Sequence, residues 1–314
     1  MAAYFPRIGI VGSGAVGGYF GARLALGGAD VRFLMRGDLG AVRTRGSLVI
    51  RDQAGTTELR PVAAFGTAAE VGAVDLVVIA LKTTSGGDLP DLVEPLLEPG
   101  TALLTLQNGL GADEYLSGLF GAQRVIGGLV FMALTRTGPG ELRCFHPGSV
   151  SIGEFGRQPA ERTRSLAGQL EAAGIRAHVV DDLLEARWRK LVWNVPFNGL
   201  AIAEGGVSTD RICADPRLAD EAHALMREVQ RAAAAFGFRI SDSFLDRQFD
   251  VTPAMGPYHP SSLVDYLAGR EVEVEPIWGE PLRRAHAAGV EMPRLASLYG
   301  RLQALCSKPP PRAP

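Results

Sequence analysis

A glycine-rich turn directly after an apolar segment is the feature that most constrains the fold of this chain. Residues 8–18 read IGIVGSGAVGG, a GxGxxG pattern between a predicted strand at 8–11 and a predicted helix at 15–26. Gly12 permits the tight turn, Gly14 lets a pyrophosphate approach the backbone, and Gly17 lets the helix pack close to the strand. N–H groups at the start of such a helix favour phosphate. We therefore expect a dinucleotide-binding loop made of Gly12, Ser13, Gly14, Ala15, Val16 and Gly17.

The first half of the chain alternates short apolar runs with helical stretches, which predicts βα units around a mainly parallel, Rossmann-type sheet. Further strands are expected at 31–35, 76–81 and 103–106, a hairpin at 48–62 that turns at Ala54-Gly55, and a helix at 89–97. The glycine-containing, strand-like pieces of residues 124–156 are expected to add antiparallel strands at the edge of the sheet.

Helical periodicity replaces the strands after about residue 180. Asp181 or Asp182 is expected to cap a helix that runs through Lys190, and Asp215-Pro216 has the residue types of an N-cap and a first helical position. Further helices are expected at about 217–236, 261–269, 276–288 and 293–306. The predicted organisation is a dinucleotide-binding domain at 1–180, an all-α substrate and catalytic domain at 181–307, and a disordered proline-rich tail at 308–314.

Composition excludes several classes of function. The formal net charge of the 314 residues is -2 and no dense Lys/Arg run occurs, so we expect no nucleic acid and no anionic membrane as partner. No apolar run approaches the roughly 18 residues of a membrane span. The N-terminus has no signal-peptide pattern and the three cysteines are widely spaced, which favours a reduced, cytoplasmic protein. The histidines lack metal-ligand spacing, so no metal is predicted, and no GxSxG elbow is present.

The end of the second predicted strand indicates the kind of dinucleotide. NAD sites usually carry an acid there, which accepts from the ribose hydroxyl, whereas this strand ends in Met35-Arg36. The guanidinium of Arg36 suits a 2′-phosphate, so the expected cofactor is NADPH. Lys82 and Asn108 follow the next two predicted strands, and parallel sheets bind ligands at those ends.

A polar stripe on the first long helix of the second half indicates the chemistry. Lys190, Asn194 and Asn198 recur every four residues and therefore share one helix face. Because the helix is otherwise apolar, these groups must face a wet cleft or be paired internally. Hydride addition to a ketone leaves an alkoxide that needs a proton, and Lys190 is a suitable donor. Pro196 predicts a local kink.

These residues resemble the ketopantoate reductase (2-dehydropantoate 2-reductase) family, in the family's order and along nearly the whole chain. The resemblance extends to residues 148–154, to Ser261 with Asp265, and to Gly269-Arg270 with Glu273. It implies NADPH-dependent reduction of 2-dehydropantoate to (R)-pantoate, a step of pantothenate biosynthesis. It also implies roles for individual residues: Lys190 as general acid, Glu273 as its acidic partner, and Asn108, Asn194, Asn198 and Ser261 as substrate-binding groups, with Asn108 near the nicotinamide ribose.

Several alternatives stay open. Taken alone, Ser261 also suits a helix N-cap after Pro260, and Glu273 a surface acid. The chain has Pro260-Ser261-Ser262-Leu263 where the family commonly has Ser-Ser-Met, and Val272 where it commonly has Thr, so another 2-oxo acid or a polyol phosphate is an alternative substrate. A non-catalytic NADPH-binding sensor is the alternative from another class. The alanine- and leucine-rich C-terminal helices are compatible with a homodimer or with closure of the domain's own core.

Overall fold

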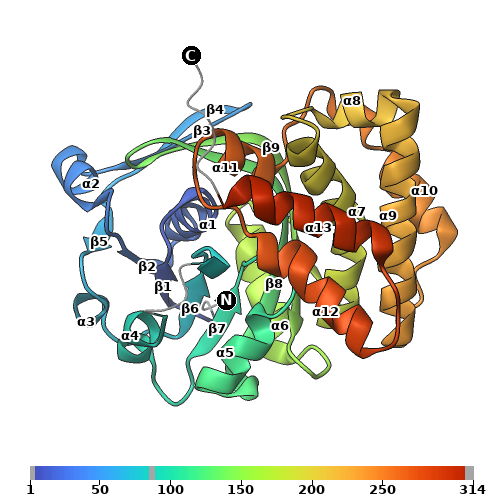
Figure 1. The fold of residues 1–314 in the computed structure, drawn as a ribbon. Coiled ribbons are helices and arrows are strands. Elements are labelled where there is room, and N and C mark those ends of the chain that lie inside the picture. Colours follow the sequence, from blue (N-terminus) through green and yellow to red (C-terminus); the bar gives the residue numbers. More distant parts are fainter. Residues whose placement is uncertain (1–3, 85–88, 308–314) are drawn as a thin grey trace. The chain divides into compact units, whose positions relative to one another are not determined.

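The structure, a computed structural model, describes residues 4–84 and 89–307, which form two compact units (Figure 1). Unit 1 comprises the described residues of Met1–Gln107 and Ala112–Leu183, and unit 2 those of Asn108–Gly111 and Leu184–Pro314. The segment Asn108–Gly111 thus lies in the first half of the sequence and yet belongs to unit 2. The predicted disordered tail at 308–314 falls outside the described residues.

A single sheet organises unit 1, as the alternation of apolar and helical stretches predicts. Nine strands follow the spatial order β4-β3-β9-β8-β7-β6-β1-β2-β5, and β10 pairs with β9. The strands are β1 (Arg7–Val11), β2 (Asp30–Leu34), β3 (Leu48–Asp52), β4 (Gly55–Leu59), β5 (Ala63–Phe65), β6 (Leu76–Ile79), β7 (Ala102–Thr105), β8 (Val125–Gly138), β9 (Glu141–Glu154) and β10 (Ala177–Val179). Pairing from β5 through β2, β1, β6 and β7 to β8 is parallel throughout.

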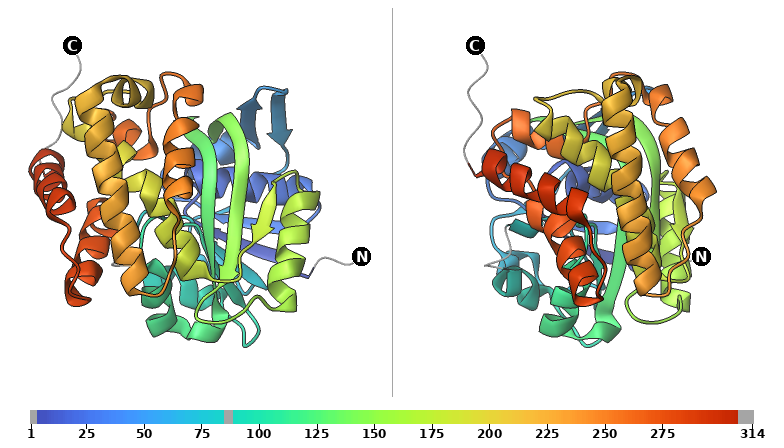
Figure 2. Two further views of the ribbon diagram at one scale, coloured as in Figure 1. Left: turned by 90° about the vertical axis from the view of Figure 1, so that its right-hand side faces the viewer. Right: turned by 45° about the vertical axis from the view of Figure 1, so that its right-hand side comes forward.

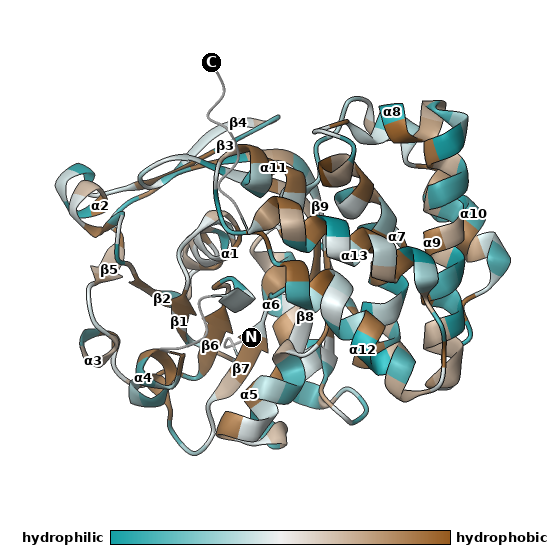
Figure 3. Cartoon of the chain, in the orientation of Figure 1, coloured by the Kyte–Doolittle hydropathy of each residue, from teal (hydrophilic) through white to brown (hydrophobic). Residues whose placement is uncertain are grey.

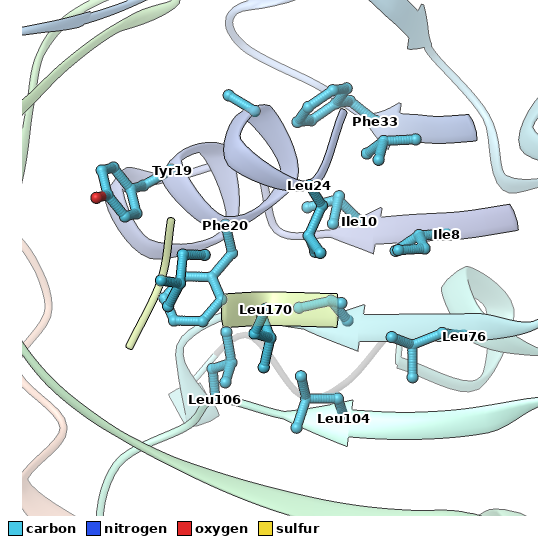
Figure 4. Close-up of a cluster of buried hydrophobic side chains, with 14 of the residues drawn as sticks. Ile8, Ile10, Tyr19, Phe20, Leu24, Phe33, Leu76, Leu104, Leu106 and Leu170 are labelled. Atoms are coloured by element: carbon cyan, nitrogen blue, oxygen red, sulfur yellow. The ribbon is translucent and has the colours of Figure 1, made fainter. Parts of the chain in front are cut away.

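Alternation along the central strands buries both faces of the sheet. Ile8, Leu76 and Leu104 point into one core, which the close-up shows packed against side chains of helices α1 (Ala15–Leu26) and α6 (Glu161–Ala172) (Figure 4). Val11 and Val77 point into a second core on the opposite face. β1, β6 and β7 are therefore mostly apolar, as their brown colour in Figure 3 shows.

The second core is covered by the remaining helices of unit 1. Side chains of α3 (Ala68–Val71), α4 (Leu89–Val93), η2 (Glu94–Leu96) and α5 (Ala112–Phe120) pack there. The expected helix at 89–97 is therefore an α-helical turn followed by a 3-10 turn. Two further short helices, α2 (Leu39–Arg45) and η3 (Ala122–Arg124), also belong to unit 1.

The expectation for residues 124–156 is only partly confirmed. β8 and β9 form a long antiparallel pair, visible as two neighbouring strands in Figure 2. They do not lie at the sheet edge, however, because β8 pairs in parallel with β7 and β9 pairs in parallel with β3. The 48–62 hairpin, confirmed as β3 and β4, forms the edge instead. The short β3 contact with β9 spans Val49–Arg51, which local sequence patterns do not reveal.

Unit 2 is helical, as expected. Its elements are α7 (Leu183–Ala203), α8 (Thr209–Ala214), α9 (Pro216–Ala235), α10 (Asp242–Asp250), η4 (Pro253–Met255), α11 (Ser261–Leu267), η5 (Glu275–Gly279), α12 (Glu280–Ala287) and α13 (Pro293–Cys306). Asp215 is confirmed as the N-cap of α9, where its side chain accepts from the backbone N–H groups of Arg217 and Leu218. The helix expected at 276–288 differs, because its first part is the π-helical turn η5.

Helix α7 is the centre of the unit 2 core. Trp188 and Phe197 on this helix are fully buried and pack with residues of α9 and α13. The helix contains Pro196 in its interior, and the carbonyl of Val195 accepts a hydrogen bond from the indole of Trp278 at 2.9 Å. The kink expected at Pro196 stays a prediction.

Three negative findings apply to residues 4–84 and 89–307. None of their helices combines the length and apolar character needed to cross a bilayer. No group of three or more His, Cys, Asp or Glu side chains is placed to hold a metal ion. The three cysteines, Cys144, Cys213 and Cys306, form no disulfide.

Candidate functional site

The glycine loop has the geometry of a close strand-to-helix turn. Gly12 adopts φ 99°, and a Cβ there would lie 2.5 Å from the backbone nitrogen of Leu81. A Cβ on Gly17 would lie 2.1 Å from the carbonyl oxygen of Gly12. Contacts under 3 Å leave no room for a side chain, so packing of the protein itself requires glycine at both positions.

Gly14 differs from its neighbours, because a Cβ built on it would meet no protein atom within 4 Å. Gly14 is also the N-cap residue of α1, a helix of 12 residues with no acidic side chain in its first turn. The first turn of α1 thus places no acidic side chain beside the N–H groups at this helix end, which favours an anion there. A glycine that the protein's own packing does not require is explained by a phosphate that approaches the backbone, so the loop fits a dinucleotide.

A pocket of about 210 Å³ lies beside this loop. Gly12, Ser13 and Gly14 line one side of it, and Arg36 with Asp38 lines another. The Ser13 hydroxyl donates to the carbonyl of Leu34 at 2.7 Å, which ties the loop to the end of β2. Arg36 is exposed, and within the described part of the chain its guanidinium has no hydrogen bond or ion pair. The Arg36 guanidinium is therefore available to a ligand, and its role in cofactor binding stays a prediction.

The ends of β6 and β7 are held together by a side chain. The Gln107 amide donates to the carbonyl of Leu81 at 3.0 Å, and its oxygen accepts from Thr105 at 3.1 Å. Leu81 lines the pocket, whereas the neighbouring Lys82, which is half-buried, is not among the lining residues. The cofactor role of Lys82 stays a prediction.

The segment Asn108–Gly111 is anchored in unit 2 by the π-helical turn η5. In that turn the N–H of Glu280 bonds to the carbonyl of Glu275, and the next residue, Pro281, has no N–H. The carbonyl of Pro276 is thus left without an intrahelical donor, and it accepts from the backbone of Leu110 at 2.9 Å. Gly109 fits here because it adopts φ 80°, and a Cβ would lie 2.2 Å from the same Pro276 oxygen.

This anchor places Asn108 beside Lys190. The Lys190 ammonium donates to the Asn108 side-chain oxygen at 2.9 Å, so two residues predicted independently are brought into direct contact. Burial and, to a smaller extent, the positive charge of Arg187 lower the pKa of Lys190, the negative charge of Glu273 raises it, and the net pKa is about 7. A lysine with a pKa near neutrality can exchange its proton at physiological pH.

Arg187 is a residue of the site that sequence reasoning missed. It is buried on α7, one helical turn before Lys190, and its guanidinium donates to the carbonyl of Gly109 at 3.3 Å. Arg187 therefore both supports the segment that carries Asn108 and disfavours the charged form of Lys190. Its only sequence signal is the spacing of three residues between two cations on an apolar helix.

The two other members of the predicted stripe are buried but differ in their contacts. The Asn198 side-chain oxygen accepts from the backbone N–H of Ser262 at 3.1 Å, which fixes the start of α11. Asn194 is 8% exposed, and among the described residues its side-chain amide has no hydrogen-bond partner. Its amide atoms are not among the fully buried side-chain atoms that lack a partner, so the amide stays accessible and can pair with a ligand.

Ser261 does not have the position expected of a helix cap. Pro260 is the N-cap residue of α11, and Ser261 is the first helical residue and is exposed. The buried serine is its neighbour Ser262, whose backbone contacts Asn198. The N-cap interpretation of Ser261 is therefore wrong, and its substrate role stays a prediction.

Two charged residues of the pocket were also missed. Asp38 and Arg136 line it together, and their side chains form an ion pair. Asp38 follows Arg36 by two residues and was within reach of sequence reasoning. Arg136 was not, because a single arginine near the polar end of a long strand resembles a solvated residue.

Comparison with known proteins gives consistent results. Residues 8–157 match the family model described as Ketopantoate reductase PanE/ApbA, and residues 182–305 match the model of its C-terminal part. A 2-dehydropantoate 2-reductase of Nostoc sp. is 36% identical over 301 residues, 94% of each chain. The crystal structure of a 2-dehydropantoate 2-reductase from Geobacter metallireducens has a TM-score of 0.92 at 39% identity, and the match covers 95% of this chain and 99% of that one.

The same fold also occurs in a more distant enzyme. A D-mandelate dehydrogenase, whose structure was solved with NADH and anilino(oxo)acetate, has a TM-score of 0.87 at 22% identity over 96% of this chain and 98% of its own. At that identity the likeness concerns the fold alone.

Proposed function

The chain belongs to the ketopantoate reductase family of oxidoreductases, and we propose that it reduces 2-dehydropantoate to (R)-pantoate with NADPH. Family membership supports a nicotinamide cofactor and a small 2-oxo acid. The observation that carries the proposal is the contact of the Lys190 ammonium with Asn108, at a lysine whose pKa is about 7. With this substrate the reaction is a step of pantothenate biosynthesis.

Unit 1 supplies the residues that would hold NADPH. The open N-terminus of α1 at Gly14 suits the pyrophosphate, and the uncommitted guanidinium of Arg36 suits the 2′-phosphate. Lys82 and Asn108 are assigned to the cofactor as well, by their places after β6 and β7. When bound, the cofactor supplies the hydride that the carbonyl carbon receives.

Lys190 is proposed as the general acid. A carbonyl oxygen that becomes an alkoxide requires one proton, and the Lys190 ammonium can donate it at hydrogen-bond distance. Asn108 orients the ammonium through its side-chain oxygen. Glu273 favours the protonated form that the reduction needs, whereas burial and Arg187 make that form a stronger acid.

The amides of α7 are proposed to bind the oxo acid. Asn194 has an unpaired, largely buried amide that can pair with a carboxylate or hydroxyl oxygen of the substrate. Asn198 uses its oxygen to fix α11, which leaves its NH₂ group as the donor for substrate. Ser261, exposed at the start of α11, is the remaining candidate.

The experiment follows NADPH oxidation by the purified chain with 2-dehydropantoate and a panel of other 2-oxo acids. We expect the highest kcat/KM with 2-dehydropantoate and a loss of about 100-fold or more in Lys190→Ala. Arg189→Ala is the matched control, because Arg189 neighbours Lys190 on α7 but contacts Glu185, the carbonyl of Arg239 and the ring of Phe244 instead. Undiminished turnover in Lys190→Ala would remove the lysine from the mechanism.

Other outcomes identify the alternatives. The mandelate dehydrogenase fold serves a different oxo acid, so the fold does not determine the side chain that the pocket accepts. A higher kcat/KM with another oxo acid would therefore assign that substrate to the same machinery. Tight NADPH binding without turnover of any oxo acid would favour a sensor.

A further inference from the structure

The cofactor pocket contains an acid as well as an arginine, and the two indicate opposite cofactors. Asp38 lies four residues after the end of β2, close to where NAD enzymes place the carboxylate that binds the ribose 2′-hydroxyl. Arg36 in the same pocket favours a 2′-phosphate instead. Whether Asp38 or Arg36 decides between NADH and NADPH depends on whether the Asp38 carboxylate can bind the ribose.

Each oxygen of Asp38 accepts a hydrogen bond from the protein. Oδ1 accepts from the guanidinium of Arg136, and Oδ2 accepts from the backbone N–H of Gly140 at 3.0 Å. The Asp38 side chain is only 10% exposed. These contacts connect the start of α2 to the turn that joins β8 and β9. Arg136 therefore neutralises the charge of Asp38, and the two contacts fix the direction in which its carboxylate points, which disfavours a hydrogen bond to a ribose hydroxyl.

The ion pair also orders Arg136. Its side chain is 49% exposed, and a lone arginine at such exposure would sample many rotamers. Asp38 instead holds it at the pocket wall, in the pocket that Arg36 also lines. The charged side chains of the lining are these two guanidiniums and one carboxylate, so the pocket carries a net positive charge only while Arg136 is present.

We propose that Arg136 is a specificity-determining residue for the cofactor: held by Asp38, it supplies a second positive charge for the 2′-phosphate of NADPH and prevents Asp38 from binding the ribose of NADH. This inference rests on the proposed use of NADPH. It assigns both Arg36, which follows β2, and Arg136, which lies on β8, to the 2′-phosphate of NADPH. It also predicts that loss of Arg136 weakens the binding of NADPH without weakening that of NADH.

The test is a titration of the full-length protein with NADPH and with NADH, followed by nicotinamide fluorescence, without any oxo acid. For Arg136→Met we expect NADPH affinity to fall about 10- to 100-fold, as for loss of one charge-assisted hydrogen bond, and NADH affinity to be unchanged or higher. Arg136→Lys keeps the charge and is expected to retain most of the NADPH preference.

Two further variants separate this role from a merely structural one. Arg51→Met is the matched control, since Arg51 is also 49% exposed and pairs with an acid, Glu141, but lies outside the cofactor pocket. It should leave both affinities unchanged. A gain in NADH affinity in Arg136→Met should disappear in the double variant that also carries Asp38→Asn. This variant lacks the carboxylate that the loss of Arg136 would release. Thermal unfolding of each variant reports whether the fold is retained.

The outcomes distinguish this inference from the cofactor proposal. A wild-type protein that does not prefer NADPH overturns both. A wild-type preference that Arg36→Met weakens and Arg136→Met leaves unchanged overturns only the role of Arg136. Equal losses for NADPH and NADH in Arg136→Met would show that the ion pair with Asp38 only maintains the pocket.

Discussion

The ammonium of Lys190 donates to the side-chain oxygen of Asn108 over 2.9 Å, although 82 positions separate the two residues in sequence. The contact exists because Asn108–Gly111 is folded into the helical unit by the Leu110–Pro276 hydrogen bond. A strand-end residue thus becomes a partner of the lysine within one compact unit. The orientation of Lys190 therefore depends on the backbone of η5 as well as on α7.

Activity should depend on pH through the charge of Lys190. Reduction needs the protonated lysine, whose pKa is about 7 without ligands, so kcat/KM for the oxo acid is expected to fall as pH rises through that pKa. Arg187→Gln removes a positive charge that lowers the pKa of Lys190, so the fall in kcat/KM should move to higher pH. Glu273→Gln removes a negative charge that raises the pKa of Lys190, so the fall in kcat/KM should move to lower pH.

The measurement is a pH profile of kcat/KM for the wild type and both variants. Arg189→Gln, on the same helix but not among the charges that act on Lys190, should leave the midpoint in place. Shifts of Arg187→Gln and Glu273→Gln in the same direction would contradict the assignment, whatever their size.

Much of unit 1 could be predicted because its signals are local. The GxGxxG turn and the continuous apolar run that ends at Val11 are both recognisable within a few residues of sequence. β10 and the partners of β9 could not be predicted. β10 has three residues, none of them fully buried, and β9 exchanges β3 for β10 as its neighbour part-way along, which only the assembled sheet determines.

Lys190 should also make the protein less stable at neutral pH than a neutral side chain would. Its pKa is 10.5 in the unfolded chain and about 7 in the folded one, so between these values the unfolded chain binds more protons and the free energy of unfolding rises with pH. Lys190→Met removes this linkage. We expect the free energy of unfolding of Lys190→Met to exceed that of the wild type most below pH 7, by on the order of a few kcal/mol. This difference should shrink towards pH 10.5.

Urea unfolding at pH 6, 8 and 10 checks this expectation. Leu191→Met is the control, since Leu191 is a buried, uncharged neighbour on α7, and its effect should not vary with pH. A Lys190→Met margin that is the same at pH 6 and at pH 10 is the result that would refute a depressed lysine pKa.

The candidate site shows which functional residues a sequence reveals. Lys190, Asn194 and Asn198 were found because helical periodicity places polar groups on one face of an apolar helix. Arg187 and Arg136 were missed because their significance lies in tertiary contacts, to Gly109 and to Asp38. A like-charged neighbour of a lysine, or an arginine near the polar end of a strand, has the sequence signature of a solvated residue.

The glycines of the loop should differ in what their replacement affects. Gly17→Ala places a Cβ 2.1 Å from the Gly12 carbonyl and should lower the free energy of unfolding by about 1–3 kcal/mol. Gly14→Ala meets no protein atom within 4 Å and should leave stability nearly unchanged while it weakens dinucleotide binding. Chemical unfolding and cofactor titration of both variants check this. A Gly14→Ala protein with wild-type affinity for NADPH and NADH would show that nothing approaches the backbone there.

A buried acid on α9 should contribute to stability by capping another helix. Glu228, 2% exposed, accepts from the backbone N–H groups of Arg294 at 3.0 Å and Leu295 at 2.8 Å, in the first turn of α13. These donors have no intrahelical partner, so Glu228→Ala leaves two of them unpaired and should cost about 1–3 kcal/mol.

Glu221 provides the matched comparison, because it lies on the same helix and pairs with the same residue, Arg294, but through the exposed side chain. Glu221→Ala should cost at most about 1 kcal/mol, as surface ion pairs do. Urea unfolding of both variants measures the difference, which should persist at 1 M salt because the Glu228 contacts are buried and hardly screened. Equal effects of the two substitutions, or a Glu228→Ala effect that salt abolishes, would mean that α13 does not depend on this cap.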